Sequence, residues 1–71
     1  PNASLSSSEV KLLVSLDSQT MQRLNHAAEK LHLSARGYLR VVKLARTVAD
    51  LASSDVVTST HLAEALRYRE A

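Results

Sequence analysis

The sequence is poor in the residues that build most ligand sites: it has no cysteine, phenylalanine or tryptophan, one glycine and one proline. Without cysteine there can be no disulfide and no thiolate metal site. A single glycine excludes a glycine-rich phosphate loop, because the known motifs need more than one glycine. No apolar run approaches the roughly 18 residues of a membrane-spanning helix, so we predict no membrane span. Any nucleotide site that this chain serves must be built mainly by other residues.

What is present indicates one small folded domain. Hydrophobic residues make up 45% of the 71 residues, which is typical of a chain with a packed core rather than a disordered one. The net charge of +2 is too small to argue for nucleic acid by itself. We expect residues 1–71 to form a single helical domain cut from a larger protein, with a tail or linker at 1–5 and a cytoplasmic location.

Apolar spacing and capping residues predict an all-α fold, a small four-helix bundle with helices at about 7–14, 18–31, 35–52 and 59–69. Ser6 and Glu9 have the spacing of a capping box, and the next starts are assigned to Asp17 or Ser18, to Ser34, and to Thr58 or Ser59. In the first helix Val10, Leu13 and Val14 lie on one face. The link between the second and third helices has no glycine or proline and should be tight.

The helix from 35 is expected to be central. On a helical wheel its polar side covers an arc of roughly 120°, made of Arg36, Arg40, Lys43, Arg46, Thr47 and Asp50. Apolar residues fill most of the remainder, from Tyr38 through Leu51. Because that apolar arc is wider than half the wheel, other helices should pack on two sides and leave a basic stripe open. Gly37 weakens the helix, and close approach of another backbone is one candidate reason.

Arg36 is the first candidate for a binding residue. It lies in the first turn of its helix, where the macrodipole disfavours a cation and favours an anion such as phosphate. A negatively charged partner would offset that cost. Arg40 and Lys43 continue the stripe, and for them a solvated face and a subunit contact are equally open. His26, His32 and His61 lack metal-ligand spacing, so we predict no metal site and no catalytic residue in this chain.

Two blocks carry a resemblance to a known family: LSARGYLRVVKLARTVADL at 33–51 and HLAEALRYR at 61–69. Together they resemble the C-terminal domain of magnesium-chelatase-like AAA+ ATPases of the ComM type. The resemblance is specific because two separate blocks match in order and at plausible spacing. It covers about residues 33–69, and the first 32 residues match only as an amphipathic lead-in.

The resemblance implies a four-helix lid subdomain behind an AAA+ core. Arg36 would then be the sensor-2 arginine that touches the ATP phosphates, with Arg40 as a weaker candidate. ATP and Mg²⁺ would be bound mainly by the core, so the parent protein would be an ATP hydrolase and this chain alone would not be an enzyme. The implied partners are the chain's own core, a homo-oligomeric ring (expected to be a hexamer), and DNA, acted on by branch migration during natural transformation.

Two other hypotheses remain open at the level of sequence. The chain could be a stand-alone helical DNA-binding or dimerisation module, similar to a histone fold, that uses the basic stripe on phosphates directly. It could also pack against other parts of its protein without any ligand. The resemblance leaves open whether Arg36 serves its own subunit's nucleotide or a neighbour's.

Overall fold

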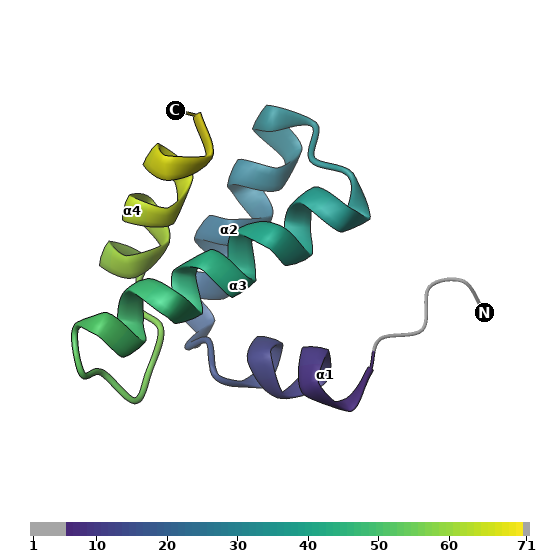
Figure 1. Cartoon of the computed structure of the whole chain (residues 1–71). Helices are drawn as coiled ribbons and strands as arrows, with labels where there is room; N and C mark the ends of the chain where they lie inside the picture. Colours follow the sequence, from purple (N-terminus) through teal and green to yellow (C-terminus); the bar gives the residue numbers. More distant parts are fainter. Residues whose placement is uncertain (1–5, 71) are drawn as a thin grey trace.

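The structure, a computed structural model, describes residues 6–70 and contains four helices with no strand in that range. They are α1 (Ser7–Val14), α2 (Ser18–Leu31), α3 (Ala35–Leu51) and α4 (Ser59–Glu70). Figure 1 shows α3 crossing the molecule, with α2 behind it, α4 along its left side and α1 below. The predicted all-α bundle is confirmed. The helix boundaries agree except that α3 ends one residue earlier and α4 one residue later; the tail predicted at 1–5 lies outside the described residues.

Polar caps determine where the first three helices begin. The Ser6 hydroxyl accepts from the Glu9 amide at 3.2 Å while the Glu9 carboxylate accepts from the Ser6 amide at 3.0 Å, which completes the predicted capping box. Asp17 caps α2. Ser34 caps α3 by accepting from the Gly37 amide at 3.1 Å. The Ser34 cap therefore fixes the first turn of α3, where Arg36 lies.

The link between α2 and α3 is as tight as the sequence predicts. His32 ends α2 in the left-handed conformation, with φ of 54°, and the Leu33 amide donates back to the Ala28 carbonyl at 3.0 Å. Left-handed backbone reverses the chain direction and satisfies carbonyls at a helix end. Three residues thus connect two helices, and the start of α3 is held against the end of α2.

The core forms around α3, which confirms its predicted central position. Its fully buried apolar side chains come from α2, α3, α4 and the α3–α4 connection: Leu24, Val41, Val42, Ala45, Ala49, Val57, Leu62 and Ala65. The connection also pairs with the α1–α2 link through a parallel bridge between Val57 and Leu16. Small residues on α3 let α4 approach closely. Residues of this chain alone therefore form a buried hydrophobic core.

Three apolar positions are more exposed than their helical spacing indicates. Val10 and Val14 are 45% and 76% exposed, because α1 packs on the core through Leu12 and through Leu13, the third residue of its predicted face. Leu51 is 83% exposed, since it is the last residue of α3 and lies past the last residue that α3 contributes to the core. The predicted packing is thus confirmed for Leu13 and wrong for Val10, Val14 and Leu51: periodicity gives an apolar side but not which part of it packs against a neighbour.

Tyr38 joins α3 to α2. Its hydroxyl donates to the Asn25 side-chain carbonyl at 2.9 Å and lies 3.6 Å from the Met21 sulfur. Burial raises the pKa of the Tyr38 phenol above 10.0. The folded state therefore holds the phenol proton more tightly than the unfolded state. This contribution to stability is fully present below pH 10 and is lost as the pH rises through the folded pKa.

We expect the Tyr38→Phe variant to lose about 0.5–1.5 kcal/mol of unfolding free energy at neutral pH, because the hydroxyl contacts with Asn25 and Met21 are removed. The chain has two tyrosines, so a Tyr68→Phe variant leaves Tyr38 as the only phenol. Its ultraviolet titration should give a pKa above the ordinary tyrosine value. An ordinary pKa in that variant would contradict the burial of Tyr38.

Gly37 does not mark close approach of another backbone, so that explanation was wrong. A Cβ added there would meet only the Ser34 hydroxyl at 3.4 Å and Leu33 side-chain carbons at 3.7 and 3.8 Å, which are ordinary contacts. We expect Gly37→Ala to raise the unfolding free energy by about 0.5–1 kcal/mol, the helix propensity gained. Urea denaturation measures the change. A destabilised variant would show that the Cβ does not fit.

Candidate functional site

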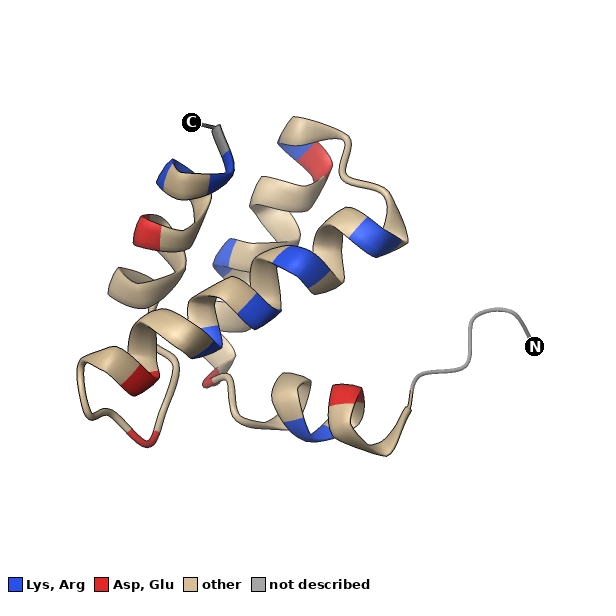
Figure 2. Ribbon diagram, in the orientation of Figure 1, with Lys and Arg blue, Asp and Glu red and all other residues tan. Residues whose placement is uncertain are grey.

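Three cations form the predicted open stripe on α3. Arg36, Arg40 and Lys43 are all exposed, and Figure 2 shows basic positions following one another along the helix. From the rise of 1.5 Å per residue they are separated by about 6 and 4.5 Å along the axis. Lys43 lies 4.0 Å from the Glu9 carboxylate, at the limit of an ion pair. The three residues therefore present positive charge to solvent on one side of the central helix.

Arg36 has no partner that explains it within residues 6–70. It is the second residue of α3, its side chain is exposed, and it makes no hydrogen bond or ion pair to another residue in that range. A cation near a helix N-terminus is disfavoured by the macrodipole. Arg36 is therefore better placed to bind an anion from outside the domain than to contact another residue within it.

Arg46 is not part of the open stripe, although the helical wheel places it there. Its guanidinium contacts the Asp50 carboxylate at 2.8 Å and donates to the carbonyls of Ser54 at 2.7 Å and Asp55 at 3.1 Å. Only 20% of its side chain is exposed. The α3–α4 connection folds back over the last turn of α3 and captures this side chain. Helical periodicity could not show that return of the chain.

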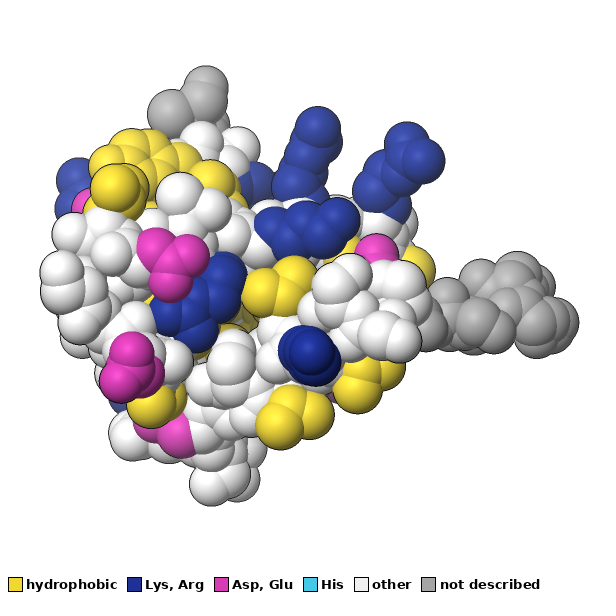
Figure 3. Space-filling model, turned by 60° about the horizontal axis from the view of Figure 1, so that its bottom comes forward, with side chains coloured by type: hydrophobic (Ala, Val, Ile, Leu, Met, Phe, Trp, Pro, Cys, Tyr) yellow, Lys and Arg dark blue, Asp and Glu magenta, His cyan; other side chains and the backbone are white. Residues whose placement is uncertain are grey.

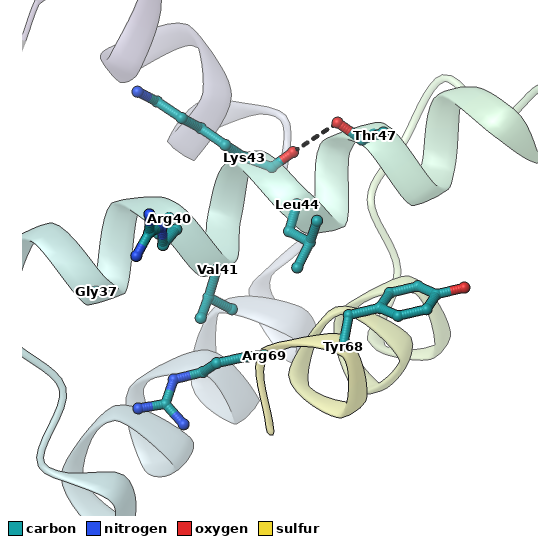
Figure 4. Close-up of a pocket in the computed structure, with 8 residues that line it drawn as sticks. All are labelled: Gly37, Arg40, Val41, Lys43, Leu44, Thr47, Tyr68 and Arg69. Carbon is teal, nitrogen blue, oxygen red and sulfur yellow. Dashed lines mark hydrogen bonds between the residues drawn. The ribbon is translucent and has the colours of Figure 1, made fainter. Parts of the chain in front are cut away.

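A hollow with a volume of about 680 Å³ lies between α3 and the end of α4. Figure 4 shows Val41 and Leu44 projecting from α3 toward α4, with Tyr68 coming from the last turns of α4. The full lining is Gly37, Arg40, Val41, Lys43, Leu44, Thr47, Tyr68 and Arg69. The hollow therefore has an apolar floor between its basic side chains.

The hollow is lined by residues of α3 and α4 that the sequence pattern did not place in one site. Arg40 and Lys43 line it, whereas Arg36 does not. Tyr68 and Arg69 were not predicted as site residues, although the basic–aromatic–basic run 67–69 at the end of the last predicted helix was a signal for them. The lining residues include three cations and no acid. In Figure 3, turned toward the lower side, Lys and Arg side chains gather at the upper right and most visible acidic ones lie to the left.

A second, smaller groove lies beside Arg36. It has a volume of about 250 Å³ and is almost entirely apolar, with a lining of Leu13, Leu33, Ser34, Ala35, Tyr38 and Leu39. It borders the first turn of α3, so Arg36 follows directly on two of its lining residues. Arg36 thus combines an exposed charge with an adjacent apolar surface that another domain could cover.

The three histidines do not form a metal centre in the described part of the chain. His61 accepts the Thr58 amide proton at 3.0 Å on Nδ1, so it serves the start of α4. His26 and His32 are exposed on and after α2. No group of three or more potential metal-ligating side chains occurs among residues 6–70. In the same range no helix is long and apolar enough to cross a membrane.

These features define a small all-α helical bundle with an exposed arginine at the start of its central helix. The chain matches the family described as magnesium chelatase, subunit ChlI C-terminal, over residues 1–69. The chain belongs to this family. Its sequence is of the ComM/YifB type, because it is 43% identical to the competence protein ComM of Haemophilus influenzae and 41% identical to YifB of Escherichia coli, an uncharacterized protein.

Each of those alignments spans 68 residues, which is 96% of this chain and 13% of the relative. YifB of Salmonella typhimurium is 35% identical over the same share. The chain therefore corresponds to a small part of the length of these curated relatives. No solved structure matches it significantly. The resemblance stated from the two sequence blocks is confirmed at the level of the family.

Proposed function

We propose that this chain is the helical lid of a ComM-type AAA+ ATPase and that Arg36 acts there as the sensor-2 arginine. The observation that carries the proposal is the place of Arg36: exposed, in the first turn of α3, and without a partner among residues 6–70. The start of α3 is fixed by the Ser34 cap and the tight link to α2. Because the backbone that carries Arg36 is fixed, its guanidinium can bind a pair of phosphate oxygens.

The residues of this chain fit one part of a nucleotide site and no more. Arg36 can contact phosphate, and the apolar groove beside it offers a surface for the core domain. With one glycine the chain has no phosphate loop, so ATP and Mg²⁺ would be held mainly by the core. When bound, ATP with Mg²⁺ supplies the phosphoryl group and the charge that Arg36 would neutralise. Arg40 stays the weaker candidate for that contact, about 6 Å further along α3.

The wider function is part of the same proposal. As the sequence resemblance implies, we propose a parent ATP hydrolase that assembles as a homo-oligomeric ring, expected to be a hexamer. It would act on DNA in the cytoplasm by branch migration during natural transformation; the name of the similar competence protein ComM agrees with the last of these roles. The stand-alone, histone-fold-like module has less support. A histone-fold-like module would complete its hydrophobic core by dimerising. In this chain α2, α3, α4 and Val57 form a hydrophobic core without a second copy.

ATP hydrolysis by the full-length protein tests the proposal. The variants are Arg36→Ala and, as a matched control with the same loss of charge, Lys30→Ala on the exposed side of α2. Loss of turnover in the first variant alone would support the sensor role. Equal turnover and equal nucleotide affinity in both variants and in the wild type would refute it.

A further inference from the structure

We infer that the hollow between α3 and α4 binds single-stranded nucleic acid, with phosphates on Arg40, Lys43 and Arg69 and a base against Tyr68. The inference deepens the proposed function, on which it rests for its biological use, by locating where this domain contacts the strand. The binding itself is a property of this chain and does not involve Arg36. The two proposals can therefore fail separately.

The charge of the hollow selects an anionic ligand. Arg40 and Lys43 come from successive turns of α3 and Arg69 from the last turn of α4, so two helices contribute positive charge to the border of the hollow (Figure 4). Among the side chains described at residues 6–69, Arg40 and Arg69 have no ion-pair partner, and Lys43 lies 4.0 Å from the Glu9 carboxylate, at the limit of an ion pair. A ligand with repeated negative charges would satisfy the three together.

The aromatic ring decides between kinds of anion. Tyr68 is 59% exposed and lines the hollow together with the apolar floor of Val41 and Leu44. Its hydroxyl donates to the Glu64 carboxylate at 3.4 Å, and this contact on its own helix orients the ring. An exposed ring beside cations is the arrangement that stacks bases while holding the backbone of a single strand.

Other anionic partners use less of this surface. An acidic protein segment would pair with the cations but would leave the face of Tyr68 without a matching group. Duplex DNA keeps its bases stacked inside the helix, so no base could reach the ring without being unstacked. A single strand offers both phosphates and free bases at the spacing of neighbouring nucleotides. The combination of charge, concavity and ring therefore favours the single strand.

Fluorescence anisotropy of a labelled 20-residue oligothymidylate with the 71-residue chain tests the inference. For three phosphate contacts we expect a dissociation constant of about 10–100 µM at low salt and a slope of about −2 in a plot of log affinity against log salt. Tyr68→Ala should weaken binding at least about fivefold, while Tyr68→Phe, which keeps the ring, should bind like the wild type. An abasic oligonucleotide of the same length should also bind at least about fivefold more weakly.

The cations are tested with matched charge removals. Arg40→Ala and Lys43→Ala should each lower the salt slope by about 0.7, the value for one phosphate on a single strand. The control Lys30→Ala lies outside the hollow and should leave the slope unchanged. Circular dichroism of each variant would check that it stays folded.

Three outcomes would overturn the inference. The first is equal binding of the abasic and normal strands together with no effect of Tyr68→Ala, which would mean only diffuse charge attraction. The second is tighter binding of a glutamate-rich peptide of equal charge, which would assign the hollow to an acidic protein. The third is equal or tighter binding of a duplex of the same length. In each case the proposed role of Arg36 in ATP hydrolysis would be unaffected.

Discussion

Replacing Arg36 with alanine in the full-length protein is expected to lower the turnover number for ATP by at least about tenfold. Loss of a single preorganised contact to transition-state charge commonly costs more than this, and arginines that stabilise transferring phosphate are among the largest cases. The structure gives Arg36 no role within residues 6–70 that alanine would disturb. A large effect on turnover with an intact fold would therefore report on the nucleotide.

The kinetic constants should separate two roles of Arg36. If it contacts phosphate only as charge develops, kcat falls and KM changes little; if it also holds ground-state ATP, KM rises as well. An Arg36→Lys variant keeps the charge but loses the fork of donors, so its activity should be intermediate. Turnover within twofold of wild type for Arg36→Ala, with unchanged affinity, would remove the sensor role.

Arg46→Ala is expected to cause the largest loss of stability among the surface substitutions, about 2 kcal/mol. The guanidinium donates to two backbone carbonyls of the α3–α4 connection as well as to Asp50, and most of its side chain is buried. Carbonyls left without these donors would lose charge-assisted hydrogen bonds. A domain of this size has only about 4–10 kcal/mol of unfolding free energy, so the loss would be a substantial fraction.

Asp50→Ala is the matched control for Arg46→Ala. Asp50 is 64% exposed in its side chain and its pair with Arg46 is of the i, i+4 type on a helix surface. Such pairs contribute about 0.3–0.5 kcal/mol. Urea denaturation followed by circular dichroism compares both variants with the wild type. Equal losses for the two variants would show that the ion pair, rather than the carbonyl contacts, is the source of the stabilisation.

The helices and their starts could be predicted because their causes are local. The capping box of Ser6 and Glu9 and the caps at Asp17 and Ser34 follow from short-range hydrogen bonds between neighbours in sequence. The central place of α3 followed from the width of its apolar side. The stripe of Arg36, Arg40 and Lys43 followed from the same wheel and is confirmed as exposed.

The rest depends on how distant parts of the chain meet. Arg46 was expected on the open face, yet the connection after α3 returns over it. Helical spacing predicted Val14 and Leu51 on apolar faces, yet both side chains are largely exposed. The hollow needs the last turns of α4 beside the middle of α3, so Tyr68 could not be placed with Arg40 from spacing alone. The sensor role of Arg36 remains a prediction.

The bridge between Leu16 and Val57 has a consequence for the order in which the domain folds. Most contacts in helical domains join nearby residues and form early, whereas this pair is separated by about 40 positions and must wait for the ends of a long loop to meet. Helix α1 contributes no fully buried side chain and adjoins this bridge. We therefore expect α2, α3 and α4 to form the folding nucleus, and α1 to dock last and to detach first.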